Sequence, residues 1–250
     1  MTIEINLNKK NKNNNFILFY NTKFDLQYLP KEIRGEKLNI LKEFFNNKNS
    51  MNKSVKIFHF QFSPFQKFVI VNLDQDDSSL SYQNIGAKLF EYLKKNLILN
   101  LEILDSNINL ITKKNNFFLN EIFHGLKNKS YQFDKYKTER KNEIINFYLS
   151  KNLFQKLKKN DRRFNALLEG INLTKDLVSE PGNVLHPDEY VNRLKKLKSE
   201  GLKISIYNKK KLKKLGMNAL LGVGQGSVRG SYLVTIEWKG LNNKQQQPLA

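Results

Sequence analysis

The sequence predicts an α/β protein, in which strands and helices alternate along most of the chain. Short apolar runs that suit buried strands, such as residues 16–20 and 68–73, are separated by longer stretches whose apolar side chains recur at helical spacing. The 250 residues, 40% of them hydrophobic, are enough to bury the core of one large or two ordinary domains. We therefore expect an α/β domain with a mixed sheet in residues 1–150 and a second α/β region after it.

Six strands and three helices are predicted in residues 1–150. Residues 8–15, between the first two strands, are polar and predict a hairpin loop or a frayed one. Ile85, Leu89 and Leu93 form the apolar stripe of the second helix, and Gly125 with Asn128 is expected to close the third. The strands are expected at residues 2–7, 16–20, 55–62, 68–73, 101–104 and 144–149, and the helices within 31–47, around 85–93 and at 117–126.

The second half continues the alternation. A helix is predicted over residues 155–178, with Phe164, Leu167, Leu168, Ile171 and Val178 on one face. Residues 179–183 form a turn cluster, and Pro187 suits the first position of a helix that Gly201 ends. Strands are expected at 203–207 and 232–238, with a short helix between them.

The glycine-rich run at 222–227 does not predict a phosphate-binding loop. The dinucleotide fingerprint needs a third glycine where Ser227 stands, followed by a helix, and a Walker loop needs Gly-Lys-Ser/Thr. A strand-like segment follows instead. We interpret the run as a turn that lets two backbones approach closely.

Composition narrows the class of protein. The absence of cysteine excludes disulfides and thiolate metal sites, and neither a signal-peptide pattern nor an apolar run of membrane-spanning length is present. We expect a soluble, cytoplasmic protein. The formal net charge of +20 suggests a nucleic-acid partner. Two observations weaken this idea: the charge is spread along the chain, and most of the basic residues are lysine, whereas arginine binds bases and phosphates better. The densest run, residues 209–214, is interpreted as a solvated helix face.

The sequence alone yields no catalytic, cofactor-binding or metal-binding residue. His59 is expected on a strand face, His124 at a helix end and His186 in a turn, and their spacing matches no metal motif. Asp74, Asp76 and Asp77 lack the glycine and closing glutamate of a calcium loop. Asp176 and Glu180, beside the turn at 179–183, could be read as catalytic carboxylates.

Two blocks of sequence, in the same order and at the same separation, resemble the leucyl aminopeptidase (cytosol aminopeptidase) family. The main block runs from Asp176 to Gly240 and contains Asp-Leu-Val-Ser-Glu-Pro-Gly-Asn, a basic helix, Leu-Gly-Met, Gly-Val-Gly-Gln-Gly-Ser and Glu-Trp-Lys-Gly. The second block, Tyr-Gln-Phe-Asp-Lys-Tyr-Lys at residues 131–137, lies ahead of it after a Gly-Leu helix end. The resemblance implies three parts: a macro-like α/β domain at 1–152, a linking helix at 153–178 and the start of an αβα catalytic domain at 179–250. It also implies that the segment with Asp176 and Glu180 is structural, so neither is given a catalytic role.

The resemblance also implies an activity. Members of the family are metallopeptidases (hydrolases) that remove N-terminal residues, leucine preferred, from peptide substrates, using two divalent ions (manganese, zinc or magnesium) in a homo-hexamer. Their metal-binding and catalytic groups would follow Ala250, so we expect a chain truncated before them, inactive alone and holding no metal. The alternative is a non-catalytic binding protein that uses its basic N-terminal domain, with nucleic acid as a possible partner. The sequence that would follow Ala250 discriminates between the two readings.

Overall fold

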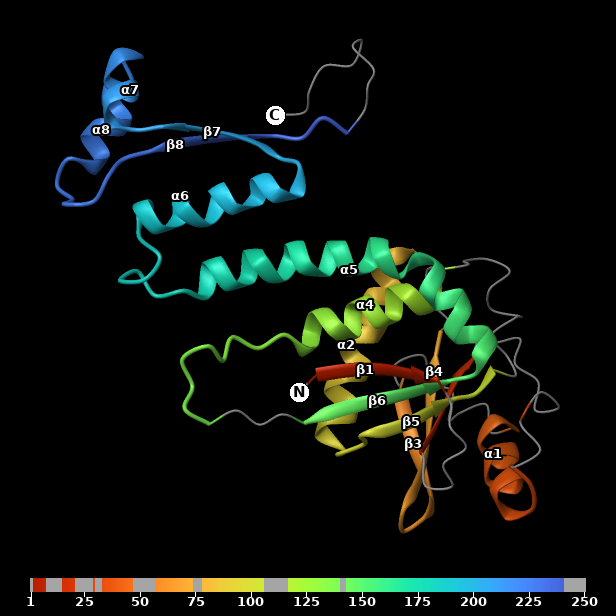
Figure 1. Cartoon of the computed structure of the whole chain (residues 1–250). Coiled ribbons are helices and arrows are strands. Elements are labelled where there is room, and N and C mark those ends of the chain that lie inside the picture. Colours follow the sequence, from red (N-terminus) through yellow and green to blue (C-terminus); the bar gives the residue numbers. More distant parts are fainter. Residues whose placement is uncertain are drawn as a thin grey trace. The chain divides into compact units, whose positions relative to one another are not determined.

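The computed structural model describes residues 2–7, 15–20, 29, 33–46, 57–73, 78–105, 117–139 and 143–240. Contacts divide the chain into two compact units, Met1–Lys175 and Asp176–Ala250. Both contain helices and strands, as the sequence predicts (Figure 1). None of the described helices is long and apolar enough to cross a membrane.

The first unit is built on a six-stranded mixed sheet, with strand order β1-β6-β5-β2-β4-β3. The first five strands in that order are parallel to their neighbours, and only β3 is antiparallel to β4. Its elements are β1 (Thr2–Leu7), β2 (Asn15–Tyr20), α1 (Glu36–Asn46), β3 (Ile57–Ser63), β4 (Gln66–Asn72), α2 (Ser79–Lys95), β5 (Asn100–Ile103), α4 (Phe118–Ser130), β6 (Ile144–Leu149) and the start of α5 (Lys151–Ser179).

The hairpin predicted between the first two strands is wrong. β5 and β6 lie between β1 and β2, and all four strands run in the same direction. Parallel strands cannot be joined by a tight turn, because the chain must return to the other end of the sheet. Asn15 is the first residue of β2, and the rest of the predicted loop lies outside the described residues, as do Asp74, Asp76 and Asp77.

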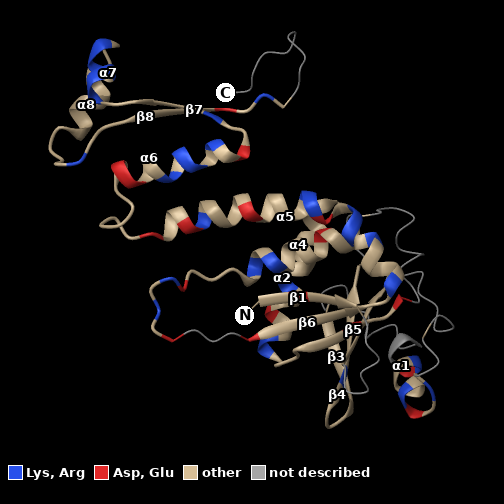
Figure 2. Cartoon of the chain, in the orientation of Figure 1, with Lys and Arg blue, Asp and Glu red and all other residues tan. Residues whose placement is uncertain are grey.

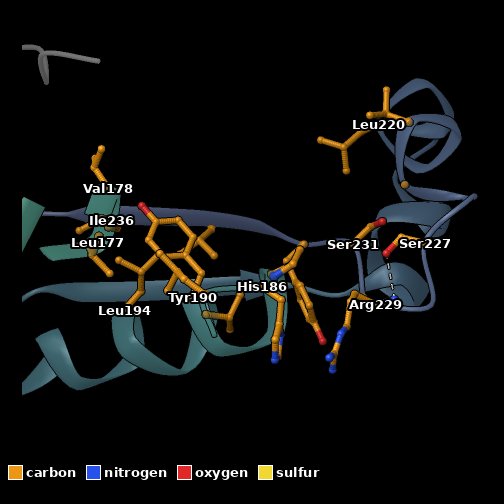
Figure 3. Close-up of a pocket in the computed structure, with 18 residues that line it drawn as sticks. Leu177, Val178, His186, Tyr190, Leu194, Leu220, Ser227, Arg229, Ser231 and Ile236 are labelled. Carbon is orange, nitrogen blue, oxygen red and sulfur yellow. Dashed lines mark hydrogen bonds between the residues drawn. The ribbon is translucent and has the colours of Figure 1, made fainter. Parts of the chain in front are cut away.

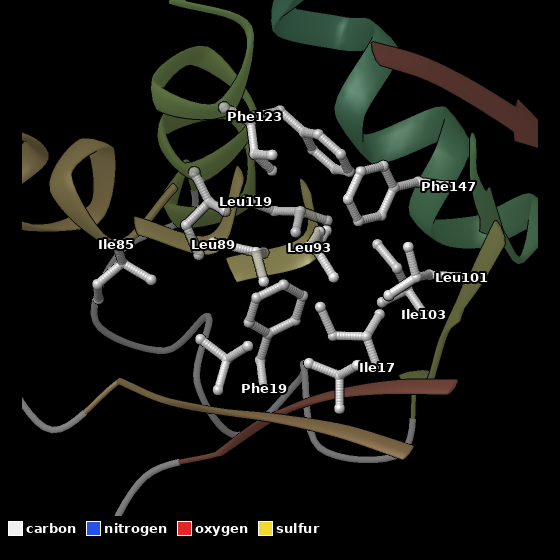
Figure 4. Close-up of a cluster of buried hydrophobic side chains, with 14 of the residues drawn as sticks. Ile17, Phe19, Ile85, Leu89, Leu93, Leu101, Ile103, Leu119, Phe123 and Phe147 are labelled. Carbon is white, nitrogen blue, oxygen red and sulfur yellow. The ribbon is translucent and has the colours of Figure 1, made fainter. Parts of the chain in front are cut away.

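The sheet buries side chains on both faces. Along β4, Val69 and Val71 belong to one hydrophobic cluster and Phe68 and Ile70 to the other, and all four are fully buried. This confirms the strand, buried on both faces, that the apolar run predicts. Helices α2 and α4 and the first turns of α5 cover one face, where their apolar side chains gather around β2, β5 and β6 (Figure 4).

Two glycines set the distance between α2 and α4. A Cβ at Gly86 would lie 2.9 Å from the carbonyl carbon of Ile122, and a Cβ at Gly125 would lie 2.7 Å from that of Gln83. Gly125 therefore does not end its helix, which continues through Ser130. Gly125 is needed because the backbones of α2 and α4 meet there. The prediction that Gly125 helps to close its helix was wrong.

Helix α5 is continuous over 29 residues. Its buried residues are Leu153, Leu157 and Phe164, which belong to the first unit. Of the predicted apolar face only Phe164 is buried, whereas Leu167 is 48% exposed and Val178 is 81% exposed.

The second unit pairs two antiparallel strands and packs helices beside them. It contains the end of α5, α6 (Pro187–Lys196), the 3-10 helix η3 (Leu197–Glu200), β7 (Lys203–Tyr207), α7 (Lys209–Lys214), α8 (Asn218–Gly224) and β8 (Leu233–Glu237). Val191 and Leu194 of α6 are buried together with Ile204 of β7. Gly201 ends η3 at a φ of 83°, as the sequence predicts.

The glycine run forms a helix end rather than a close approach of two backbones. Gly222 and Gly224 lie in the last turn of α8. A Cβ at Gly222 or Gly226 would meet nothing within 4 Å, and one at Gly224 would meet only the Ser231 side chain. The prediction of a turn holds only for the residues after Gly224.

Candidate functional site

The second unit contains an apolar groove of about 730 Å³ that could bind a partner. It is lined by the end of α5, by α6, by α8, by β8 and by the loop before β8 (Figure 3). Its lining residues all lie between Leu177 and Ile236, within the block from Asp176 to Gly240. Its lining includes Leu177, Val178, His186, Tyr190, Val223, Arg229, Tyr232, Val234 and Ile236.

The chain enters α6 through a well-formed N-terminal cap. Pro187 occupies the first turn, and the Nδ1 atom of His186 accepts a hydrogen bond from the backbone N–H of Glu189 at 3.4 Å. Asp188 and Glu189 place negative charge where the helix dipole favours it. The sequence predicts this helix start but treats His186 only as a turn residue. A polar residue directly before a proline at the first helical position was the available signal.

One end of the groove is polar. The Tyr232 hydroxyl donates a hydrogen bond of 2.6 Å to Asp188, and the other carboxylate oxygen of Asp188 lies 3.5 Å from Nδ1 of His186. The hydrogen bond from Tyr232 is the main reason that the pKa of Asp188 lies below its ordinary value, and the same bond raises the pKa of Tyr232. Arg229 lies close enough to favour the charged form of Asp188 as well.

A buried ion pair fixes the turn at 179–183 to α6. The Glu180 side chain is 1% exposed and accepts a hydrogen bond of 2.8 Å from Nη1 of Arg193. The Nε atom of Arg193 donates to Glu189 at 3.0 Å, and these two hydrogen bonds raise the pKa of Arg193. Glu180 is thus positioned to hold the turn in place.

The three histidines belong to different elements. His59 is on β3, where its Nδ1 is 2.8 Å from the Tyr92 hydroxyl, and burial lowers its pKa. His124 is not at a helix end as predicted: it lies in the middle of α4, 5% exposed, against Phe164. Within the part of the chain that the structure describes, no three His, Asp or Glu side chains come together in a way that could hold a metal ion.

The lysine run at 209–214 forms α7. Most of this helix is coloured as Lys in Figure 2. Its five lysines are exposed, and Leu212 is fully buried. This arrangement is that of a helix with one buried residue and a solvated basic face.

Most of the chain superposes on solved structures. A mutant of tomato leucine aminopeptidase superposes with a TM-score of 0.63 over 94% of this chain and 50% of its own, at 17% identity. The bottromycin maturation enzyme BotP, in complex with Mn, superposes with a TM-score of 0.57 over 91% of this chain and 45% of its own, at 13% identity. At these identities the likeness shows the fold alone, which is the α/β fold of the leucine aminopeptidases.

The sequence comparisons add the family. Residues 172–250 match the model of the cytosol aminopeptidase family, catalytic domain. A probable cytosol aminopeptidase of Phytoplasma mali (strain AT) is 33% identical over 211 residues, which are 82% of this chain and 42% of that protein. The chain belongs to the cytosol aminopeptidase family, and it spans less than half the length of this relative.

Proposed function

We propose that this chain is the leading part of a leucyl aminopeptidase, comprising an N-terminal domain at 1–152, a linking helix at 153–178 and the start of the catalytic domain at 179–250. The observation that carries the proposal is the catalytic-domain match at 172–250 together with a relative named as a probable cytosol aminopeptidase. The reaction would be hydrolysis of the N-terminal peptide bond of a peptide, with leucine preferred.

The family resemblance supports two divalent cations as cofactors, with manganese, zinc and magnesium as the candidates. Bound in pairs, such ions activate water and stabilise the charged intermediate of hydrolysis. The BotP structure in complex with Mn favours manganese among them. The described residues of this chain do not offer a set of ligands that fits such a pair, so no step of the reaction is assigned to them.

Within this proposal the described residues have structural tasks. The pair formed by Glu180 and Arg193 holds the chain between α5 and α6, and the His186 cap with the Asp188–Tyr232 hydrogen bond joins the start of α6 to the segment entering β8. Assembly as a homo-hexamer and a cytoplasmic location complete the proposal, supported by the family resemblance and by the name of the relative.

An activity assay on the 250-residue polypeptide tests the proposal. We expect no hydrolysis of leucine p-nitroanilide above the blank when Mn²⁺ is added, because the metal-binding groups of the family are proposed to lie in another part of the catalytic domain. A parallel assay on the Phytoplasma mali relative provides the positive control. Hydrolysis by the 250-residue polypeptide that is abolished by a chelator would contradict the assignment of the ligands to another segment.

A further inference from the structure

Another cavity, of about 310 Å³, lies in the first unit at the edge of its sheet. β1 is the outermost strand at this edge, and among the described strands it pairs with β6 alone (Figure 1). The lining combines four consecutive residues of β1 with Lys127 of α4 and with residues of α5. A cavity at the small end of the range for ligand sites suits a metabolite rather than a large cofactor.

The backbone of β1 offers hydrogen-bond donors and acceptors to this cavity. The N–H group of Thr2 donates a hydrogen bond of 2.9 Å to the carbonyl oxygen of Glu143, which directly precedes β6. Alternate residues of a strand direct their N–H and C=O groups to the same side, so those of Ile3 and Ile5 point away from β6. Within the described part of the chain, no strand lies across that edge to bond them. A ligand can therefore use these groups.

One wall of the cavity is apolar. Phe154 and Leu157 of α5 line it together with Ile3 and Ile5 of β1. Leu157 is a buried member of the hydrophobic core, and the other three side chains pack against that core. An aliphatic side chain placed on this wall would be removed from water, which is favourable.

Charged side chains of both signs border the apolar wall. Lys158 and Asp161 follow Phe154 by four and seven residues, so they lie on the same face of α5, and Lys127 of α4 joins them in the lining. The Nζ atom of Lys158 lies 5.2 Å from the centre of the Phe154 ring. Lys127 and Asp161 are half-buried, and neither they nor Lys158 form a salt bridge or a side-chain hydrogen bond with another described residue. Half-buried charges without such partners are costly, and a ligand of complementary charge would offset that cost.

We propose that this cavity binds a free α-amino acid with an aliphatic side chain. Lys127, Lys158 and a backbone N–H of β1 hold its carboxylate, and Asp161 with a backbone C=O of β1 holds its ammonium group. The side chain lies on the apolar wall. A ligand with a single charge would leave a group of the opposite sign in the cavity unpaired. Amino acids of this class are what a leucine-preferring aminopeptidase releases, and only this connection rests on the proposed function.

Three related ligands test the proposal on the 250-residue chain. They are L-leucine, 4-methylpentanoate, which is leucine without its amino group, and 3-methylbutylamine, which is leucine without its carboxylate. In ligand-observed NMR titrations we expect saturable binding of L-leucine. Each analogue should bind at least tenfold more weakly, because it leaves a charged group of the cavity without a partner.

Two pairs of substitutions in α5 locate the binding. Asp161→Asn should weaken leucine binding at least tenfold, whereas Glu169→Gln, outside the cavity on the same helix, should leave it within twofold. Lys158→Met should weaken it at least fivefold, since Lys127 remains, and its exposed neighbour Lys159→Met is the control. Far-UV circular dichroism verifies that the variants are folded.

The assignment of Asp161 to the ammonium group has its own test. In the Asp161→Asn variant, leucine and 4-methylpentanoate should bind about equally, because the group that distinguishes them has lost its partner. A preference for leucine that survives this substitution would contradict the assignment.

Three results would overturn the proposal as a whole. These are the absence of saturable leucine binding, equal binding of leucine and both analogues by the unaltered chain, and equal leucine binding by the Asp161→Asn and Glu169→Gln variants, because the ligand would then lie elsewhere. The titrations do not depend on peptidase activity, so they distinguish failure of this proposal from failure of the proposed function.

Discussion

The crossing of α2 and α4 at Gly86 and Gly125 predicts that Gly125→Ala destabilises the first unit. The new Cβ would lie 2.7 Å from the carbonyl carbon of Gln83, whereas carbon atoms prefer about 3.5–4.0 Å, so the helices must separate by roughly 1 Å. Such overpacking costs about 3 kcal/mol at the upper end of the usual range, and alanine regains about 1 kcal/mol of helix propensity. We expect a net loss of about 2 kcal/mol and a melting temperature lower by roughly 4–8 °C.

Gly170→Ala is the matched control for this substitution. Gly170 is also in a helix, but a Cβ there would meet nothing within 4 Å. This variant should gain up to about 1 kcal/mol from helix propensity. Thermal unfolding followed by circular dichroism, with amide hydrogen exchange of the α2 and α4 peptides, measures both effects. If Gly125→Ala is as stable as Gly170→Ala, the two backbones do not meet at Gly125 and the reasoning is wrong.

Two further substitutions, one in each unit, test interactions of buried side chains. Arg193→Met removes the ion-pair partner of buried Glu180, so we expect faster amide exchange over residues 180–190. The control is Lys195→Met, which changes an exposed residue of the same helix. Equal exchange in the two variants would show that the ion pair does not hold the turn. His124→Leu removes a buried imidazole whose Nδ1 has no hydrogen-bond partner among the described residues and whose pKa is lowered mainly by burial. In the unaltered chain, His124 takes up a proton at a higher pH when the chain is unfolded than when it is folded. The free energy of unfolding should therefore fall as the pH drops through about 6.5. In urea titrations between pH 7 and 5.5, the His124→Leu variant should show a smaller fall. An unchanged slope would exclude His124 as its source.

Local patterns in the sequence predict most elements of this fold. The stripe of Ile85, Leu89 and Leu93 predicts α2, and Pro187 with the acidic residues after it predicts the start of α6. Both signals lie within a few residues of the feature that they predict. The strand formed by residues 203–207 is likewise found where the alternation of polar and apolar side chains predicts it.

Features that depend on distant contacts could not be predicted in this way. The strand order separates β1 from β2 although they follow each other in sequence, and pairing between distant strands leaves no local signal. Gly125 is needed because α2 crosses α4 there, whereas the sequence offers only a glycine near an expected helix end. For the groove, the sequence identifies the turn at 179–183 and the helix after it, but not the hydrogen bond between Asp188 and Tyr232, which are 44 residues apart.

A chimeric enzyme tests the central claim, that this chain forms the leading part of an aminopeptidase. In the chimera, this chain replaces the 42% of the Phytoplasma mali relative that it matches. The measurement is hydrolysis of leucine p-nitroanilide with Mn²⁺, compared with the unaltered relative. We predict activity within about tenfold of that relative, a loss of roughly 1.4 kcal/mol or less in transition-state stabilisation. A folded chimera that shows no hydrolysis, beside an active parent, would contradict the claim.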